Sequence, residues 1–282
     1  MKAGRASKTA AYVAAYRALE STRPDPLFRD PYAAAFLPVS LQLAVKAARV
    51  PGLRHALIAY SDHRALGART SAIARTAAID EIVVGAARDG MTQLVLLGAG
   101  FDCRAHRLAL PGVTTFEVDR VETQAIKRRV VPSGVRYVEV DFLRDDAFEK
   151  LAAAGWQRDV RSLIVWEGVT NYLTEDAVLR VLSDVGRCAP GTRIAFTYIH
   201  RGVLDGSVEF VGGAKIRANV AALDEPWTWG ITPDALGAFV SRAGLSLVSD
   251  AGADEYRQRW LGETSPGYAF YRLSVAEKLR TV

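Results

Sequence analysis

Cysteine and histidine are scarce in this sequence. Its 282 residues include two cysteines, Cys103 and Cys188, and four histidines. Cys103 and Cys188 lie too far apart in the sequence to be the paired cysteines of a zinc module, and two cysteines do not indicate a disulfide framework. The sequence therefore predicts a protein of a reducing compartment, for which the cytoplasm is the default expectation, and we expect no metal site.

Long apolar runs and blocks of charge are missing as well. No window approaches the ~18 uninterrupted apolar residues that a membrane span needs. The stretch Thr9–Tyr16 meets Arg17 before any small-residue cleavage site, which argues against a signal peptide. The 36 basic and 31 acidic residues leave a net charge of +5 that is spread along the chain. We therefore expect a small-molecule partner, no nucleic acid, no membrane, and a monomer or homodimer.

The residues that are present suit a globular protein. Half of them are hydrophobic and 24% are charged, which is enough for a sizeable core. At roughly 150 residues per domain, the length allows one large or two small domains. Helical spacing of apolar residues dominates before residue 90, in Thr9–Ser21 and Asp62–Arg88, with prolines between them. We therefore predict an all-helical cap over residues 1–90.

After residue 90, short apolar runs alternate with helical stretches, which is the pattern of βα units on a mostly parallel sheet. The predicted fold class is α/β, a doubly wound and mostly parallel sheet in a domain over residues 91–282. The predicted strands are Gln93–Leu97, Thr114–Val118, Arg136–Val140, Leu163–Trp166, Arg193–Tyr198, Leu245–Asp250 and Ala269–Val275.

Two helices of this domain have recognisable ends. Thr174 precedes two acidic residues and is predicted to be an N-cap. Thr232-Pro233 predicts a second helix start, and Gly244 predicts its left-handed stop. Residues 200–230 follow no regular pattern. Loops of that length in α/β domains are often lids or substrate walls, so we predict a substrate-wall insertion there.

The most informative segment is the end of the first predicted strand. It runs into Gly98, Ala99 and Gly100, where two glycines allow a tight turn and let a ligand lie against bare backbone. Asp119 ends the next strand, about 20 residues later, where a carboxylate can accept both hydroxyls of a ribose. These residues, with the adjacent Arg120, predict a nucleoside site.

The loop also discriminates between nucleoside cofactors. A dinucleotide fingerprint would have a third small residue at position 103, where this chain has a cysteine preceded by Asp102. We expect the Asp102 carboxylate to repel a pyrophosphate. S-adenosylmethionine has no phosphate and carries sulfonium and ammonium charges, so the loop favours it over NAD.

Further strand ends extend this site. Asp141 follows the third predicted strand, where it could bond an adenine amino group, with Phe142 available to pack on the ring. Glu167 and Gly168 follow the fourth strand, near the expected methionine moiety. Because parallel strands end at one edge of a sheet, we expect the three carboxylates to gather there.

The motifs together resemble those of the leucine carboxyl methyltransferase family, in its branch of bacterial small-molecule O-methyltransferases and actinobacterial methyltransferases. The likeness runs nearly end to end. Its segments are Asp25–Pro31, Gly98–Arg104, Phe116–Asp119, Trp166–Leu173, Trp227–Pro233 and Gly252–Tyr256. The resemblance implies a Rossmann-like methyltransferase fold with seven strands and S-adenosylmethionine as the cofactor, but it implies no particular substrate.

The resemblance also implies roles for two cations. Arg75 falls where the family has an arginine on the carboxylate of the cofactor, a task that suits a guanidinium. Lys8 falls where a lysine can do the same. The family often has threonine at the position of Cys103, and we expect this difference to be harmless.

The implied activity is methyl transfer to an oxygen of a small metabolite, of polyketide-like or aromatic type in secondary metabolism. A carboxylate acceptor needs no general base, whereas a hydroxyl needs one, and His200 is then the candidate. Tyr172 and Tyr198 could orient the acceptor oxygen. The predicted substrate-binding residues are Arg201, Trp227 and Trp229. The alternatives are an NAD(P)-dependent oxidoreductase using the same glycine loop and a non-catalytic, cofactor-binding protein.

Overall fold

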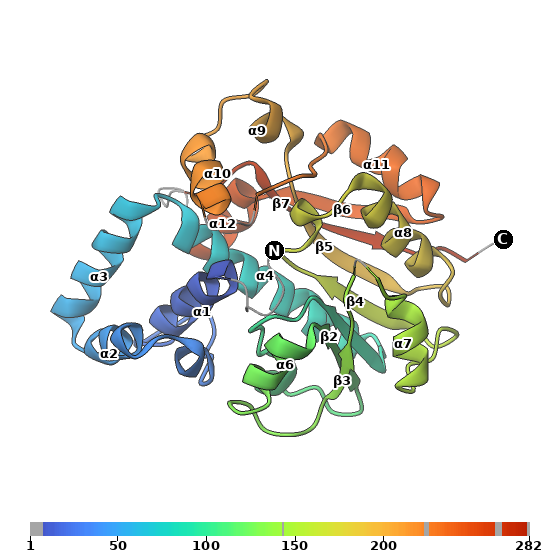
Figure 1. Cartoon of the computed structure of the whole chain (residues 1–282), viewed down its shortest axis with the longest axis horizontal. Coiled ribbons are helices and arrows are strands. Elements are labelled where there is room, and N and C mark those ends of the chain that lie inside the picture. Colours follow the sequence, from blue (N-terminus) through green and yellow to red (C-terminus); the bar gives the residue numbers. More distant parts are fainter. Residues whose placement is uncertain (1–7, 143, 223–225, 263–266, 281–282) are drawn as a thin grey trace.

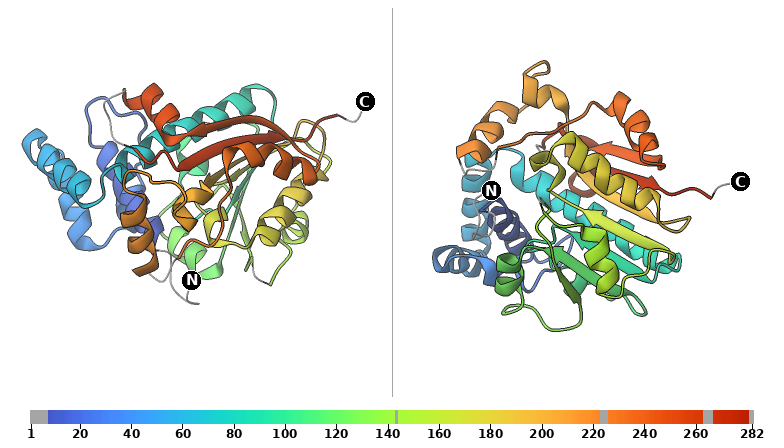
Figure 2. Two further views of the ribbon diagram at one scale, coloured as in Figure 1. Left: turned by 90° about the horizontal axis from the view of Figure 1, so that it is seen from above. Right: turned by 45° about the vertical axis from the view of Figure 1, so that its right-hand side comes forward.

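A seven-stranded sheet with helices on both faces forms the body of the protein (Figures 1 and 2). The computed structural model describes residues 8–142, 144–222, 226–262 and 267–280. The strands are β1 (Gln93–Leu97), β2 (Thr114–Asp119), β3 (Arg136–Glu139), β4 (Ser162–Trp166), β5 (Arg193–Ile199), β6 (Ser246–Gly252) and β7 (Tyr271–Glu277).

The strand order is β3-β2-β1-β4-β5-β7-β6, and β7 is antiparallel to both of its neighbours. The first five strands are parallel. The chain therefore leaves β1 in one direction along the sheet and, after β3, continues from β4 in the other. Ligands of such sheets bind beyond the carboxyl ends of the strands at this reversal. The predicted fold class is confirmed.

The helices in the described parts of the chain are α1 (Lys8–Glu20), α2 (Val39–Ala47), α3 (Pro51–Arg64), α4 (Ala68–Arg88), α5 (Arg104–Arg107), α6 (Val121–Lys127), α7 (Ala147–Ala153), α8 (Glu175–Gly186), α9 (Arg201–Asp205), α10 (Gly213–Ala222), α11 (Pro233–Arg242) and α12 (Ala253–Leu261), with short 3₁₀ helices at Ala33–Phe36 and Thr170–Tyr172.

Alternating side chains of the parallel strands supply two cores. Val95 and Leu97 face a core shared with α7, α8 and α11, and Leu94 and Leu96 face a core shared with α4 and α12.

The N-terminal helices divide differently from the prediction. The helical pattern of Asp62–Arg88 is interrupted between α3 and α4, where Gly67 has a φ of 86°. Helix α4 packs on the sheet through Ala74, Ile79 and Val83. We therefore propose that the extension ends near Gly67, not near residue 90. Helices α1 to α3 stand beside the sheet (Figure 1), and α2 and α3 bury none of their residues.

The predicted helix ends hold with one difference. The side chain of Thr174 accepts a hydrogen bond from the amide of Ala177 and caps α8. Pro233 begins α11 and Gly244 follows it with a φ of 74°, but the Thr232 side chain makes no capping bond. Helices α9 and α10 occupy part of the 200–230 segment. In the described ranges, no helix combines the length and apolar character needed to cross a bilayer.

Candidate functional site

The glycine loop after β1 has the backbone that its sequence predicted. Gly98 and Gly100 have φ values of 65° and 46°, which side chains rarely tolerate. A Cβ on Gly98 would also lie 2.5 Å from Cγ2 of Val169. The amides of Gly98 and Ala99 donate to the carbonyl of Val118 at 2.8 and 3.0 Å. The loop is therefore folded back onto the end of β2.

Asp119 lies at that end and is tied to the loop. Its carboxylate accepts hydrogen bonds from the amides of Gly100 at 2.6 Å and Arg120 at 2.7 Å. Burial raises the pKa of Asp119, and these two amides oppose the rise. Each carboxylate oxygen can accept more than one bond, so the group retains capacity for two ligand hydroxyls. The arrangement fits the predicted contact with a ribose.

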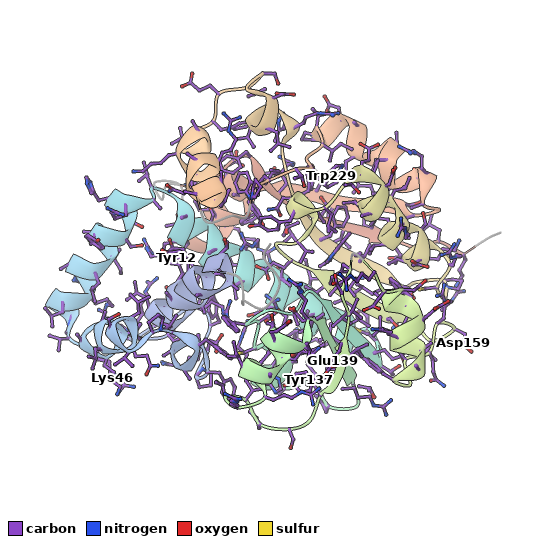
Figure 3. The ribbon with its side chains drawn as sticks, viewed as in Figure 1. Tyr12, Lys46, Tyr137, Glu139, Asp159 and Trp229 are labelled. Carbon is purple, nitrogen blue, oxygen red and sulfur yellow. The ribbon has the colours of Figure 1, made fainter. Side chains whose placement is uncertain are left out.

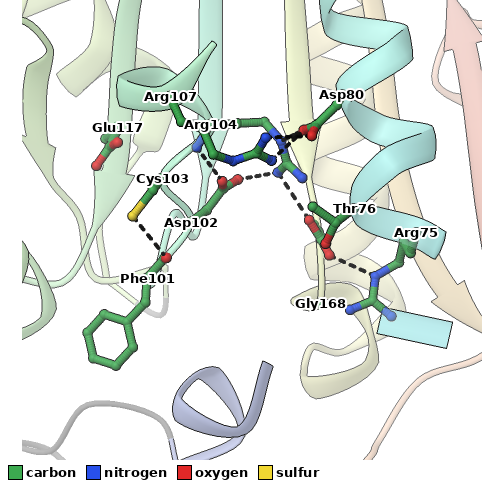
Figure 4. A network of polar contacts seen from close by, with 12 residues as sticks. Arg75, Thr76, Asp80, Phe101, Asp102, Cys103, Arg104, Arg107, Glu117 and Gly168 are labelled. Carbon is green, nitrogen blue, oxygen red and sulfur yellow. Dashed lines mark hydrogen bonds and ion pairs between the residues drawn. The ribbon is translucent and has the colours of Figure 1, made fainter. Parts of the chain in front are cut away.

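Glu167 lies between the buried guanidinium groups of Arg75 and Arg104, the two arginines that Figure 4 labels on either side of Asp80 and Thr76. Nε of Arg75, on α4, donates to Oε1 of Glu167 at 2.7 Å, and Nη1 of Arg104, on α5, donates to Oε2 at 3.1 Å. Burial opposes ionisation of Glu167, but the charges of Arg75 and Arg104 outweigh it and lower the pKa to about 2. The carboxylate is therefore ionised at neutral pH. The predicted residues Arg75 and Glu167 are thus brought together, although 92 residues separate them.

The network extends beyond the predicted residues. Arg104 also pairs with Asp102, in the glycine loop, and with Asp80, on α4, at 3.2 Å. Arg107 holds the same Asp80 at 2.6 Å. Sequence analysis missed Asp80, Arg104 and Arg107. Two arginines one helical turn apart, directly after a glycine loop, were the available signal.

This pairing corrects the electrostatic argument against NAD. The Asp102 carboxylate is compensated by the guanidinium of Arg104, so it cannot be counted on to repel a pyrophosphate. The short helix after the glycine loop is a different reason to disfavour NAD. A dinucleotide site places pyrophosphate at the start of a full helix after the glycine loop, whereas here α5 has four residues.

Asp141, Phe142 and Gly168 lie at the same edge of the sheet. Asp141 and Phe142 follow β3, and the partly buried Phe142 packs against the core. The amide of Gly168 donates to Oγ1 of Thr197 at 2.8 Å. Lys8 begins α1, but its side chain lies outside the described residues. Helix α1 approaches the loop at Ala10, whose Cβ would be 3.8 Å from a Cβ on Gly100.

The predicted catalytic residues do not form one cluster. His200 caps α9: its Nδ1 accepts the amide of Gly202 at 3.0 Å. Burial and the charge of Arg272 lower the pKa of His200, so the ring is neutral and carries its proton on Nε2. Tyr198 is completely buried, and its hydroxyl donates to Oδ2 of Asp250 at 3.0 Å.

These bonds limit what the side chains can do. A neutral His200 in this tautomer can donate from Nε2 but has no free nitrogen to accept a proton. The Tyr198 hydroxyl is held inside the sheet, and burial raises its pKa far above its ordinary value. We leave Tyr198 out of the proposed site. Tyr172 is half-buried in the 3₁₀ helix after β4 and remains a candidate.

The two predicted tryptophans pack in different places. Trp227 lies 5.9 Å from the ring of Phe270, in a cluster with Ile199, Val203 and Tyr268 after β5. Trp229 is buried in the core under α8 and α11, with its ring 5.5 Å from Phe239 (Figure 3). Only Trp227 is therefore kept as a substrate contact.

Arg201 begins α9 with an exposed side chain. Within the described parts of the chain, no group of three or more His, Cys, Asp or Glu side chains is placed to hold a metal ion.

Solved structures with a related arrangement include two methyltransferases. Human N-acetylserotonin methyltransferase, solved with S-adenosylmethionine, is 15% identical, with a TM-score of 0.47 over 75% of this chain and 56% of that one. Magnesium protoporphyrin IX methyltransferase of Synechocystis, solved with S-adenosylhomocysteine, is 12% identical, with a TM-score of 0.47 over 73% of this chain and 84% of that one.

Relatives by sequence cover most of the chain. A Streptomyces coelicolor protein provisionally named an S-adenosyl-L-methionine-dependent methyltransferase is 36% identical over 240 residues, 78% of this chain and 80% of that protein. A Frankia alni protein of the same provisional name is 37% identical over 207 residues, 70% of each chain. The leucine carboxyl methyltransferase model matches residues 10–186, more than half of the sequence. The chain belongs to the leucine carboxyl methyltransferase family.

Proposed function

We propose that the protein transfers a methyl group from S-adenosylmethionine to an oxygen of a small metabolite. That the protein is an S-adenosylmethionine-dependent methyltransferase follows from its family and from the relatives that cover most of its length. An oxygen acceptor and a small metabolite as substrate are inferred from the site.

The observation that carries the proposal is the pairing of Arg75 with Glu167 beside the glycine loop. A buried guanidinium and a buried carboxylate offer one partner each to the carboxylate and ammonium of an amino acid. Asp119 can accept the ribose hydroxyls, and Asp141 with Phe142 stands at the next strand end for the adenine. The donor set at this edge therefore fits S-adenosylmethionine.

When bound, S-adenosylmethionine supplies a methyl carbon on a sulfonium. An acceptor oxygen forms a bond to that carbon, the carbon–sulfur bond breaks, and its electron pair stays on the sulfur of S-adenosylhomocysteine. The protein's contribution is to hold the acceptor oxygen close to the methyl carbon and in line with that bond.

The acceptor side is aromatic. Phe270 lies 5.8 Å from Phe210 and 5.9 Å from Trp227, and His200 lies 5.1 Å from Phe210. This cluster reaches Arg75 through Tyr271, whose ring lies 4.6 Å from the guanidinium carbon. A flat, apolar acceptor suits these rings. Because His200 has no free nitrogen to take a proton, an acceptor that is already ionised, such as a carboxylate, fits best.

Calorimetry with S-adenosylhomocysteine and with NADH tests the cofactor. We expect binding of the first and none of the second. Binding of NADH alone would instead favour the oxidoreductase alternative.

Mass spectrometry of a metabolite panel, incubated with the protein and S-adenosylmethionine, tests the reaction. We expect a methyl ester or methyl ether of an aromatic or polyketide-like acid or phenol. Cofactor binding without any methylated product across a wide panel would favour the non-catalytic alternative.

A further inference from the structure

Arg104 connects the three parts of the network around Glu167. Its guanidinium contacts Asp102 in the glycine loop and Asp80 on α4 (Figure 4). It also contacts Glu167 after β4. The residue is 1% exposed. A group with contacts on three separate elements, and almost no access to solvent, is fixed in place by its surroundings. Arg75 differs because Glu167 is its only ion-pair partner among the described residues.

The charges of this network balance as a set. The three guanidinium groups of Arg75, Arg104 and Arg107 face the three carboxylates of Asp80, Asp102 and Glu167. If Arg75 were to leave Glu167 for another carboxylate, Arg104 would still hold one oxygen of Glu167. The other oxygen, Oε1, would then be open to a new cation.

Such an exchange suits the zwitterion of an amino acid. One ion pair, between Arg75 and Glu167, would be replaced by two, from Arg75 to the α-carboxylate and from Glu167 to the α-ammonium. Burial without a partner is costly for either side chain, which explains why they hold each other in the ligand-free protein.

We propose that Arg104 is a positioning residue that keeps Glu167 in place while Arg75 exchanges Glu167 for the carboxylate of the cofactor's amino-acid part. The inference rests on the proposed function. It assigns Arg104 to recognition of the methionine moiety and gives it no part in binding the nucleoside, which Asp119 serves at the end of β2.

Binding of two ligands separates these roles. S-adenosylhomocysteine contains both the nucleoside and the amino acid, whereas 5′-methylthioadenosine lacks the amino acid. In Arg104→Met we expect calorimetry to show S-adenosylhomocysteine affinity reduced about tenfold or more, the lower end for losing a hydrogen bond to a charged group. Affinity for 5′-methylthioadenosine should change by less than about twofold, because this ligand lacks the amino acid that Glu167 binds. A larger change would mean that a hydrogen bond to the nucleoside had been lost.

Arg107→Met is the matched control. Arg107 is an arginine of the same helix, pairs with the same Asp80, and has no ion pair with Glu167. We expect it to leave the ratio of the two affinities unchanged. Arg104→Lys keeps the charge but not the fork of donors. Its affinity for S-adenosylhomocysteine should lie between those of wild type and Arg104→Met.

The pH dependence adds a readout that a merely structural role would not move. Arg104 helps to keep Glu167 ionised. In Arg104→Met the S-adenosylhomocysteine affinity should therefore fall as pH is lowered from 7 toward 5, while in wild type it stays level over that interval. If Arg104→Met misfolds, Arg104→Lys carries the test with the two ligands, because it keeps the charge but loses the fork of donors.

The outcomes are distinct. Equal losses for both ligands, no loss for either, or an equal effect of Arg107→Met would overturn the assignment of Arg104. A wild-type protein that binds neither ligand would overturn the proposed function itself.

Discussion

The two sides of the candidate site are built from different side chains. At the carboxyl ends of β1, β2 and β4 lie charged groups that are already paired, such as Glu167 with Arg75 and Arg104. Beyond β5 lie aromatic rings, with Phe270 in contact with Phe210, Trp227 and Tyr268. The first side offers directional bonds to a charged ligand, whereas on the second side the half-buried Phe210 and Trp227 offer apolar surface over the buried Phe270.

This difference predicts that the cofactor side tolerates substitution less well than the acceptor side. A buried ion network accepts few changes, because removing one member leaves its partner uncompensated. An aromatic cluster tolerates hydrophobic substitutions that conserve volume at lower cost. Substitutions on the two sides should therefore fail in different ways.

Glu167→Gln should have the largest effect on both stability and cofactor binding. It removes one negative charge and leaves Arg75 and Arg104 buried with less compensation, which we expect to cost about 3–5 kcal/mol of unfolding free energy, as for a broken buried ion pair. It should also abolish measurable S-adenosylhomocysteine binding. Urea unfolding and calorimetry check the two effects. Glu139→Gln, which alters an exposed glutamate 3.9 Å from Arg128, is the control, and an equal loss there would contradict the argument.

The same residue predicts a pH dependence. Its folded-state pKa of about 2 lies below the ordinary value of 4.5, so its contribution to stability is present above pH 4.5 and is lost as pH falls toward 2. The difference in unfolding free energy between wild type and Glu167→Gln should therefore shrink between pH 6 and pH 3. A difference that stays constant over this interval would show that Glu167 is not held ionised by its arginines.

The tryptophans sharpen the comparison on the acceptor side. Trp229 is 4% exposed and packs in the main core, so Trp229→Ala should cost about 3–5 kcal/mol of unfolding free energy. Trp227→Ala should cost less, because Trp227 is half-buried, and should raise the KM of the acceptor without changing S-adenosylhomocysteine affinity. Equal destabilisation by both would place Trp227 in the core as well.

Asp119→Ala should have a smaller effect on cofactor affinity than Glu167→Gln, and it also removes the bonds to the amides of Gly100 and Arg120. Loss of its bonds to the ribose should reduce affinity by about 1.5–3 kcal/mol, the range for hydrogen bonds to a charged group. Calorimetry with S-adenosylhomocysteine measures this loss. An unchanged dissociation constant would remove Asp119 from the site.

Much of the fold could be predicted because its signals are local. Each predicted strand is present, with ends that differ by one or two residues, since buried parallel strands are short apolar runs between turn residues. Gly98 and Gly100 could be predicted to adopt left-handed backbone because the tight turn after β1 requires it.

The features that could not be predicted from the sequence depend on tertiary contacts. Asp80 lies on α4, 24 residues before Arg104, and nothing near it in the sequence marks it as a partner. Helices α2 and α3 bury no residues, although they carry apolar side chains such as Val39, Leu43 and Leu53, so their apolar residues do not mark a face in the core. Trp227 packs against Phe270 and Trp229 against Phe239, and nothing in the sequence shows that these two neighbouring tryptophans have different partners.

His200 should give the smallest effect and the clearest test of the acceptor side. Because Nδ1 accepts the amide of Gly202, His200→Ala removes a helix cap and should cost about 0.5–2 kcal/mol of unfolding free energy. His200→Asn can keep that cap and should restore stability. With a carboxylate acceptor, kcat should be nearly unchanged in both variants, because no proton has to be removed. If His200→Asn folds normally but loses kcat together with the acid limb of the pH–rate profile, His200 is a general base after all, and the acceptor is a hydroxyl.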